Sequence, residues 1–151
     1  MSEYLLDSSA LWRLLRDERL RDERLRFAWQ ETALDGAVRS CHPQRAEFLR
    51  SARDLKEYEE RSAMFAELYA DAPVPEGAAQ WVGGIRRRAA ENGAHQALSA
   101  VDLQISATAA HLGLIVLHDD EDFVTAARFA VELQQHNAHD GPRRGGARAG
   151  W

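Results

Sequence analysis

The chain of 151 residues is poor in several features, and each shortage excludes a class of protein. It has one cysteine, Cys41, so an internal disulfide is impossible, and a reducing, cytoplasmic compartment is expected. No apolar run approaches the about 20 residues that span a bilayer, and the first residues lack the pattern of a signal peptide. We therefore expect a protein that does not engage membranes.

Lysine is as scarce as cysteine, because Lys56 is the only one among 19 basic Lys and Arg residues. The formal net charge of -5 argues against a protein that holds nucleic acid through its overall charge. The arginines gather locally instead, above all in Arg86-Arg87-Arg88. A GC-rich genome is the plainer explanation for the excess of arginine, but planar guanidinium groups also suit phosphates, and both explanations can hold together.

The remaining composition is that of one globular domain, with 45% hydrophobic residues. We expect this domain to span residues 1–137, followed by a flexible tail at 138–151, because the tail is rich in glycine and arginine. A tandem repeat covers residues 16–25 as two copies of Arg-Asp-Glu-Arg-Leu. Its period of five does not match a helical turn, so it is interpreted as a local duplication on an exposed helical hairpin.

Apolar runs and helical patterns alternate along the chain, which predicts an α/β fold with a mostly parallel sheet of about five strands. The predicted strands are Glu3–Leu6, Ala37–Cys41, a short one within residues 71–75, Leu114–Leu117 and Val131–Gln135. The predicted helices begin at Ser8 or Ser9 and at Pro43, and cover Tyr58–Tyr69, Glu76–Glu91, Ser99–Leu112 and Phe123–Phe129.

Acidic residues follow two of these strands and begin one of the helices. Asp7 ends the first strand, Asp102 lies near the start of the helix after Ser99, and Asp120 and Asp122 follow the strand Leu114–Leu117. Ligands of parallel sheets bind beyond the carboxyl ends of the strands, so these carboxylates are expected to meet there. Crowded carboxylates repel unless a cation lies between them, and oxygen ligands favour a hard divalent ion such as Mg²⁺. No histidine and cysteine grouping has zinc spacing.

Four segments in this order resemble the motifs of PIN domains, and in particular the toxin PIN proteins of the VapC type. They are Tyr4–Leu11, Cys41–Glu47, Ser99–Ala109 and Leu117–Phe123. The resemblance extends to about Gln135 and implies a three-layer α/β/α fold. It also implies an endoribonuclease that uses Mg²⁺ or Mn²⁺ to hydrolyse RNA with an activated water. Such a toxin is held inactive by a small antitoxin protein, and the resemblance further implies a homodimer.

The resemblance assigns a role to each acidic residue. Asp7 and Asp102 are the principal metal ligands, and Asp120 completes the site. Glu47 orients or deprotonates the attacking water, or binds a second metal. Two further residues support the site from nearby, and four arginines are candidate contacts to the RNA backbone. They are Ser8 and Asp122, and Arg45, Arg86, Arg87 and Arg88.

Each assignment has a plainer alternative. In the alternative, Asp7 only caps the helix that begins at Ser8, and Asp102 only complements the dipole of its own helix. The alternative for Glu47 is a side chain that faces solvent and pairs with Arg50, three residues further along the chain. Asp119 is the alternative to Asp120 as the metal ligand, since both residues follow the same strand. His118, in the same stretch, is expected to be an ordinary loop histidine.

Two other functions compete with the nuclease. One is a catalytically silent PIN scaffold that only binds a protein partner. The other is an acidic-pocket signalling module of the phospho-receiver type, which needs a lysine near its last strand, where this chain has none. The sequence does not identify the RNA, the number of metal ions or the antitoxin.

Overall fold

A computed structural model describes residues 2–15 and 23–143 of the chain. Five strands of these residues form one sheet in the order β3-β2-β1-β4-β5, and every pairing is parallel. The strands are β1 (Tyr4–Leu6), β2 (Val38–Ser40), β3 (Ala70–Asp71), β4 (Ile115–His118) and β5 (Gln134–Asn137). The prediction of an α/β fold with a mostly parallel sheet is confirmed.

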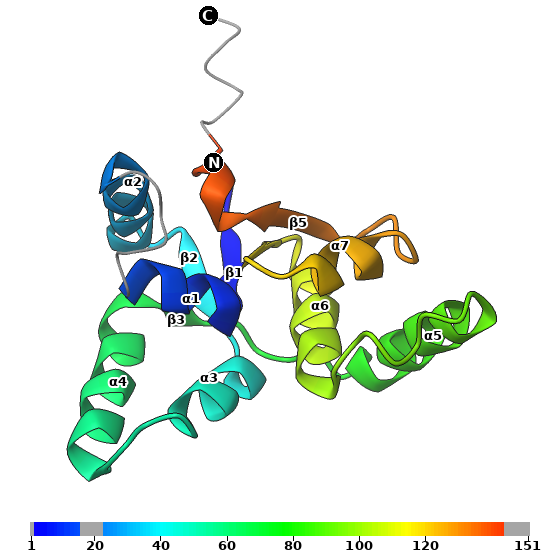
Figure 1. The fold of residues 1–151 in the computed structure, drawn as a ribbon, viewed down its shortest axis with the longest axis horizontal. Coiled ribbons are helices and arrows are strands. Elements are labelled where there is room, and N and C mark those ends of the chain that lie inside the picture. Colours follow the sequence, from blue (N-terminus) through cyan, green and yellow to red (C-terminus); the bar gives the residue numbers. More distant parts are fainter. Residues whose placement is uncertain (1, 16–22, 144–151) are drawn as a thin grey trace, which may run out of the picture.

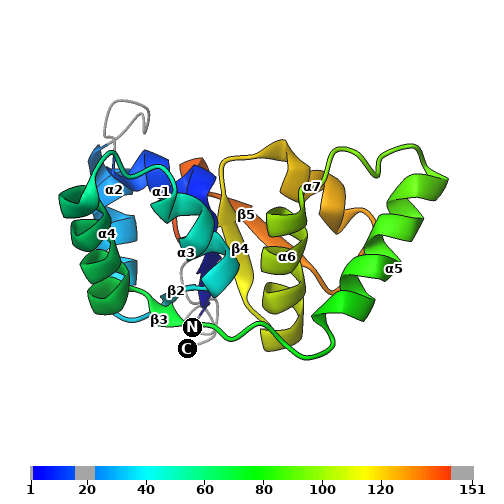
Figure 2. The same ribbon diagram turned by 90° about the horizontal axis from the view of Figure 1, so that it is seen from below.

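Helices cover both faces of the sheet and complete the three layers (Figure 1). The helices α1, α2, α3 and α4 lie on one side, and α5, α6 and α7 lie on the other (Figures 1 and 2). Their bounds are α1 (Ser8–Leu15), α2 (Glu23–Leu34), α3 (His42–Leu49), α4 (Leu55–Leu68), α5 (Ala78–Glu91), α6 (Ala100–Leu112) and α7 (Glu121–Ala127). No helix of residues 2–15 and 23–143 is long and apolar enough to cross a membrane.

Two hydrophobic clusters fill the spaces between the layers, because successive strand residues point to opposite faces. Tyr4 and Leu6 of β1 belong to the cluster under α1 to α4, whereas Leu5 belongs to the cluster under α5 to α7. All three side chains are at most 1% exposed. Each large apolar side chain buried in this way stabilises the fold by about 1.5–3 kcal/mol.

The strand order places a topological switch point beside the central strand. The chain runs outward from β1 to β2 and β3, and then returns across the sheet to β4 and β5. Strands β1 and β4 are therefore neighbours, with Leu6 paired to Leu117, and Asp7 N–H donates to Leu117 O at 2.9 Å. The crevice beyond the ends of β1 and β4 is where open parallel sheets bind ligands.

Two element boundaries differ from the predicted ones. Helix α4 begins three residues before Tyr58, because the Asp54 side chain accepts a hydrogen bond from Glu57 N–H. Strand β5 begins at Gln134, later than the predicted Val131, which is fully exposed after a turn.

The expected hairpin and tail lie partly outside the described residues. Residues 16–22 of the tandem repeat are outside them, as are residues 144–151 of the tail. Within the segment expected as tail, Ala138–Asp140 forms a short 3₁₀ helix, and the Arg143 N–H donates to the Tyr4 hydroxyl at 2.7 Å. Ala138 is buried and its carbonyl accepts from the Trp29 indole, also buried, at 2.8 Å.

Candidate active site

Asp7 lies directly after β1 and is 3% exposed. Its Oδ2 accepts hydrogen bonds from the Ser9 N–H at 3.0 Å and the Ser9 hydroxyl at 2.5 Å, so it caps the start of α1. Burial raises the pKa of Asp7, and the charge of Asp120 raises it further. The capping role considered as an alternative is therefore present, and it coexists with a position at the switch point.

Asp102 stands in the first turn of α6, where the Ser99 side chain caps the helix by accepting its N–H at 3.0 Å. Burial raises the pKa of Asp102 to about 7, and the charges of Asp7, Asp120 and Glu47 contribute to this rise. The four acidic residues assigned to the site thus interact electrostatically, although they come from four separate segments. These carboxylates repel one another, and a bound cation would relieve that repulsion.

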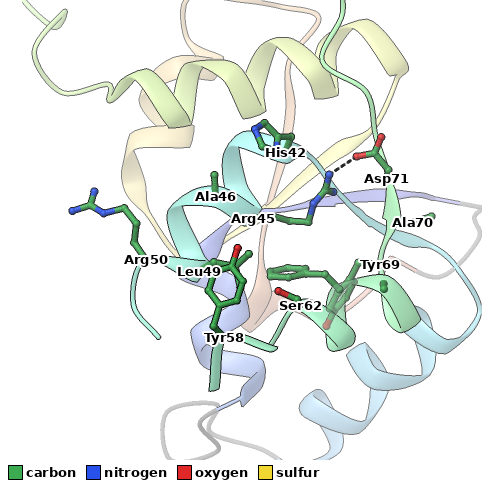
Figure 3. A pocket seen from close by; sticks show the side chains of 12 residues that line it. His42, Arg45, Ala46, Leu49, Arg50, Tyr58, Ser62, Tyr69, Ala70 and Asp71 are labelled. Carbon is green, nitrogen blue, oxygen red and sulfur yellow. Dashed lines mark hydrogen bonds and ion pairs between the residues drawn. The ribbon is translucent and has the colours of Figure 1, made fainter. Parts of the chain in front are cut away.

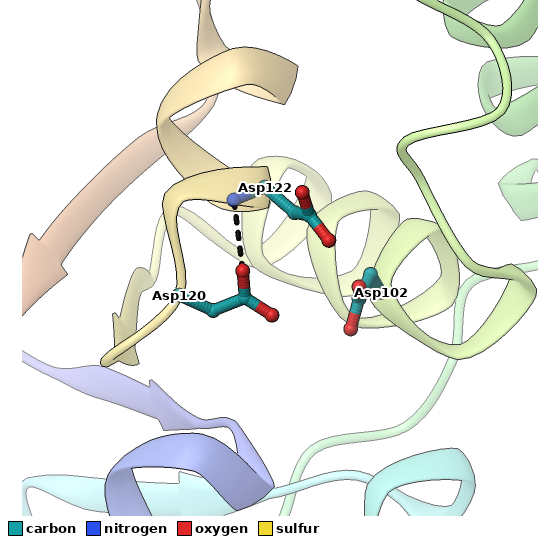
Figure 4. A group of neighbouring side chains, drawn as sticks. All are labelled: Asp102, Asp120 and Asp122. Carbon is teal, nitrogen blue, oxygen red and sulfur yellow. Dashed lines mark hydrogen bonds between the residues drawn. The ribbon is translucent and has the colours of Figure 1, made fainter.

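A tighter group lies within this set. One carboxylate oxygen from each of Asp102, Asp120 and Asp122 comes within 4.8 Å of the other two. Asp120 Oδ1 accepts from the Asp122 N–H at 3.0 Å and so caps α7, while its other oxygen faces Asp102 (Figure 4). Within the described part of the chain, no arginine or lysine forms an ion pair with these three carboxylates. The donor set, three close carboxylates with no cationic partner, fits a hard divalent ion.

This group differs from the expected one in its third member. Asp122, expected as a supporting residue, supplies an oxygen to the group, and the assignment of Asp7 as a principal ligand stays a prediction. The difference arises because α7 begins directly after Asp120, which turns the Asp122 side chain of its first turn toward Asp102 (Figure 4).

Glu47 approaches the site from α3. Burial raises the pKa of Glu47, the charge of Asp7 adds to the rise, and Arg50 opposes it. Among the residues that the structure describes, no ion pair joins Glu47 to Arg50. Ser8 offsets the rise in the pKa of Glu47 only in part, and Ser8 Oγ accepts from the buried Gln44 amide at 3.1 Å. The supporting role of Ser8 stays a prediction.

Asp119 points to other partners. Its carboxylate accepts from Arg13 Nε and from Asn137 Nδ2 at 3.4 Å, and His139 Nε2 lies 3.4 Å away. Burial acts to raise the pKa of Asp119, but the bond from Arg13 and the charges of His139 and Arg13 outweigh it and lower the pKa. Asp119 thus ties α1 to the end of β5, which leaves Asp120 to face Asp102.

Two of the four candidate RNA contacts are already occupied. Arg86 Nη1 donates to the carbonyls of His95 and Leu98, both at 2.6 Å, and so anchors the loop that leads into α6. Arg45 donates to Ser40 O at 2.8 Å and pairs with Asp71 at 2.6 Å. Such contacts use the guanidinium groups that RNA phosphates would need.

The other two arginines are exposed near the end of α5. Arg87 lies 3.6 Å from Glu91 in a weak surface pair, and Arg88 lies in the last turn of the helix. Figure 2 shows this end of α5 on the same side of the molecule as the loop to α6 and the start of α7. Arg87 and Arg88 therefore remain the candidates for backbone contacts.

Sequence reasoning missed the role of His118. It is not a loop residue but the last residue of β4, and its side chain is fully buried. Its Nδ1 accepts from the Asp120 N–H at 3.0 Å, and its Nε2 lies 2.6 Å from Gln135 Oε1. Its position directly after a continuous apolar run was the signal that it belongs to the strand.

A groove of about 740 Å³ lies between α3, α4 and β3, away from the acidic residues (Figure 3). Its floor and walls are mainly apolar, and the ion pair between Arg45 and Asp71 closes one end. The residues around it include Leu49, Tyr58 and Tyr69. None of the acidic residues assigned to the site is among those that line it.

Comparison with known proteins gives a consistent result. The PIN domain family model matches residues 4–129. Ribonuclease VapC6 from Mycobacterium tuberculosis, strains CDC 1551 / Oshkosh and ATCC 25618 / H37Rv, is 48% identical over 102 residues, which are 68% of this chain and 80% of the relative.

Solved structures of low sequence identity share the fold. VapBC2 from Rickettsia felis, crystallised with a DNA fragment from its promoter, matches with a TM-score of 0.69 at 12% identity, over 89% of this chain and 97% of that one. VapBC-5 from Mycobacterium tuberculosis, a member of the VapBC family of toxin-antitoxin systems, matches with a TM-score of 0.61 at 24% identity, over 91% of this chain and 99% of that one.

Proposed function

The chain belongs to the PIN-domain family, and on this basis we propose that it is an endoribonuclease of the VapC type, the toxin of a toxin–antitoxin pair. The family match spans all four acidic segments, and the similar ribonuclease shares nearly half of its aligned residues. The observation that carries the proposal is the close approach of Asp102, Asp120 and Asp122 beside the switch point of the sheet.

We propose that this group, with Asp7 beside it, holds Mg²⁺ or Mn²⁺. A bound divalent ion would supply charge neutralisation at the phosphate and an acidified water. Asp102 and Asp120 hold the ion, and Asp122 provides a further oxygen. Asp7 is buried and hydrogen-bonded to Ser9, so its charge contributes to the attraction of the cation without leaving its cap.

Glu47 is the proposed base. Its pKa is raised by burial and by Asp7, so it holds a proton more readily than an ordinary surface glutamate does. It is partly exposed on α3, where a water can reach it. In this position it accepts a proton from the water that attacks the phosphodiester.

RNA is the proposed substrate, and its backbone reaches the acidic group past α5. Arg87 and Arg88 supply positive charge on that side of the molecule. Such contacts are to phosphates, so they set affinity and leave the choice of sequence to other residues. Because the protein is negatively charged overall, this local charge carries the attraction.

The proposed partners are a cognate antitoxin and a second copy of the chain, in the cytoplasm. Two of the solved structures of similar fold are VapBC proteins, which supports an antitoxin partner. An antitoxin that brings an arginine to the acidic group would neutralise the carboxylates and exclude the metal. For the homodimer, α2 offers two apolar side chains at the surface, because Phe27 and Leu34 are 61% and 74% exposed.

An RNA cleavage assay with purified protein tests the proposed activity. Total cellular RNA is incubated with Mg²⁺ or Mn²⁺, with EDTA, and with the variants Asp102→Asn and Asp120→Asn. Cleavage is expected only for the wild type with metal. The matched control is Asp54→Asn, which makes the same substitution at the cap of α4, where asparagine caps as well as aspartate does.

The alternative hypothesis, a catalytically silent PIN scaffold, predicts the opposite result in the same assay. It would give no cleavage in the wild type, yet would still bind the antitoxin. Cleavage by Asp102→Asn at the wild-type rate would remove the proposed mechanism, because the activity would then come from a contaminant or from another site.

A further inference from the structure

His118 is the buried histidine nearest to the acidic group among the described residues. It ends β4, is 0% exposed, and its ring packs against Phe123 with centroids 5.2 Å apart. Both ring nitrogens are engaged, Nδ1 with the Asp120 backbone and Nε2 with the Gln135 side chain on β5. No other described side chain hydrogen-bonds the Asp120 N–H.

These contacts determine which nitrogen carries the proton. The Asp120 N–H can only donate, so Nδ1 must accept and carries no proton. Nε2 then carries the proton and donates to Gln135 Oε1 at 2.6 Å. Gln135 thus stabilises the form of the ring whose Nδ1 accepts from the Asp120 N–H.

The bond to Asp120 lies at the turn where β4 gives way to α7. The two oxygens of the Asp120 carboxylate have different roles here. Oδ1 accepts from the Asp122 N–H and caps α7, and the other oxygen faces Asp102 (Figure 4). The direction of that carboxylate depends on the backbone that carries it. A fixed Asp120 N–H therefore fixes both Asp120 and the first turn of α7, which bears Asp122.

We propose that His118 is a positioning residue, which holds Asp120 and Asp122 in the geometry needed to bind the divalent ion opposite Asp102. It does not touch the ion. Groups that orient metal ligands by hydrogen bonds typically change metal affinity or activity by about 10–100-fold when they are removed. The inference rests on the proposed function only in taking these three carboxylates as the metal site.

Two variants separate the two hydrogen bonds of the ring. His118→Asn retains an acceptor oxygen at the place of Nδ1, but it is too short to reach Gln135. His118→Gln retains a donor at the place of Nε2, but it offers no acceptor at the place of Nδ1. The control is His136→Gln, the same substitution on β5, where the ring packs near Tyr4 and Trp29 and not against the site loop.

The measurement is Mn²⁺ affinity of the full-length metal-free protein by calorimetric titration, with melting temperature recorded for each variant. We expect His118→Gln to weaken Mn²⁺ binding by about tenfold or more, and His118→Asn to stay near the wild type. His136→Gln should bind Mn²⁺ normally even where it melts earlier. If the His118 variants fold poorly, Gln135→Leu serves instead, because it removes the acceptor that selects the ring's proton position and should weaken Mn²⁺ binding in the same direction.

Each outcome decides the matter. Equal Mn²⁺ affinity in wild type and His118→Gln, or equal losses in His118→Gln and His118→Asn, would overturn the positioning role and leave the metal site intact. A wild-type protein that binds no Mn²⁺ would overturn both the positioning role and the metal site of the proposed function.

Discussion

Asp119 and Asp120 are neighbours in the chain, yet their carboxylates contact different parts of the protein. Asp119 accepts from Arg13 of α1 and from Asn137 of β5, whereas Asp120 caps α7 and faces Asp102. One of the pair therefore ties the loop to the scaffold, and the other is directed into the acidic group. The two residues should respond differently to the same chemical change.

Replacing either residue by asparagine tests this division of roles. Asp120→Asn should abolish measurable Mn²⁺ binding, because it removes one of three charges from the group. Asp119→Asn should retain Mn²⁺ binding and destabilise the fold by about 1 kcal/mol, because it loses a partly buried ion pair. In a domain of this size that loss lowers the melting temperature by about 2–4 °C. Calorimetric titration and thermal denaturation provide the two readouts, and the reverse pattern would assign the ligand to Asp119.

Metal affinity should depend on pH near neutrality. The pKa of Asp102 is raised to about 7, first by burial and then by its acidic neighbours, so at pH 6 most of this side chain is protonated and competes with the ion. Mn²⁺ affinity is expected to fall as the pH drops from 8 to 6. Titrations at several pH values check this, and an affinity that does not change over the range would show that Asp102 is not a ligand.

The stability of the metal-free protein should follow the opposite direction. Because the folded pKa of Asp102 lies above its ordinary value of 3.8, the folded state binds more protons between these values, and stability is lost as the pH rises through them. Relative to the wild type, Asp102→Asn should therefore gain stability as the pH approaches 7 and above. Melting curves of the two proteins from pH 5 to 8 measure the difference, which saturating Mn²⁺ should reverse.

Three consecutive arginines should have two distinct effects. Arg86→Ala should lower the melting temperature, because it removes two hydrogen bonds to the loop before α6. Arg87→Ala and Arg88→Ala should leave the melting temperature unchanged and weaken RNA binding. The salt slope of the affinity should fall by about 0.7 for each phosphate that is no longer neutralised. Binding of single-stranded RNA to the Asp102→Asn protein over a range of salt concentrations checks this without cleavage.

The sequence pattern was sufficient for the sheet and for which segments carry the acidic residues. Continuous apolar runs such as Leu114–Leu117 are typical of buried parallel strands, and a serine before a helix marks its start, as Ser99 does. The pattern was insufficient where long-range contacts decide. It does not reveal that Arg13 pairs with Asp119 across 106 positions of the chain, or that the Asp122 carboxylate lies close to those of Asp102 and Asp120.

Burial was the other quantity that the pattern left open. Arg86 was grouped with Arg87 and Arg88 because three consecutive arginines look alike in the sequence. The sequence does not show that the Arg86 side chain donates to a backbone carbonyl while its neighbours are exposed. His118 was assigned to a loop because a polar side chain is buried only where it finds hydrogen-bond partners, and here Gln135 and Asp120 engage both ring nitrogens inside the protein.

The most direct test of the whole account is an anomalous difference map from crystals of the protein soaked in Mn²⁺. The account predicts a manganese peak at bonding distance from one oxygen each of Asp102 and Asp120, with Asp122 beside it. A peak elsewhere, or none at this group in protein that cleaves RNA with Mn²⁺, would contradict it.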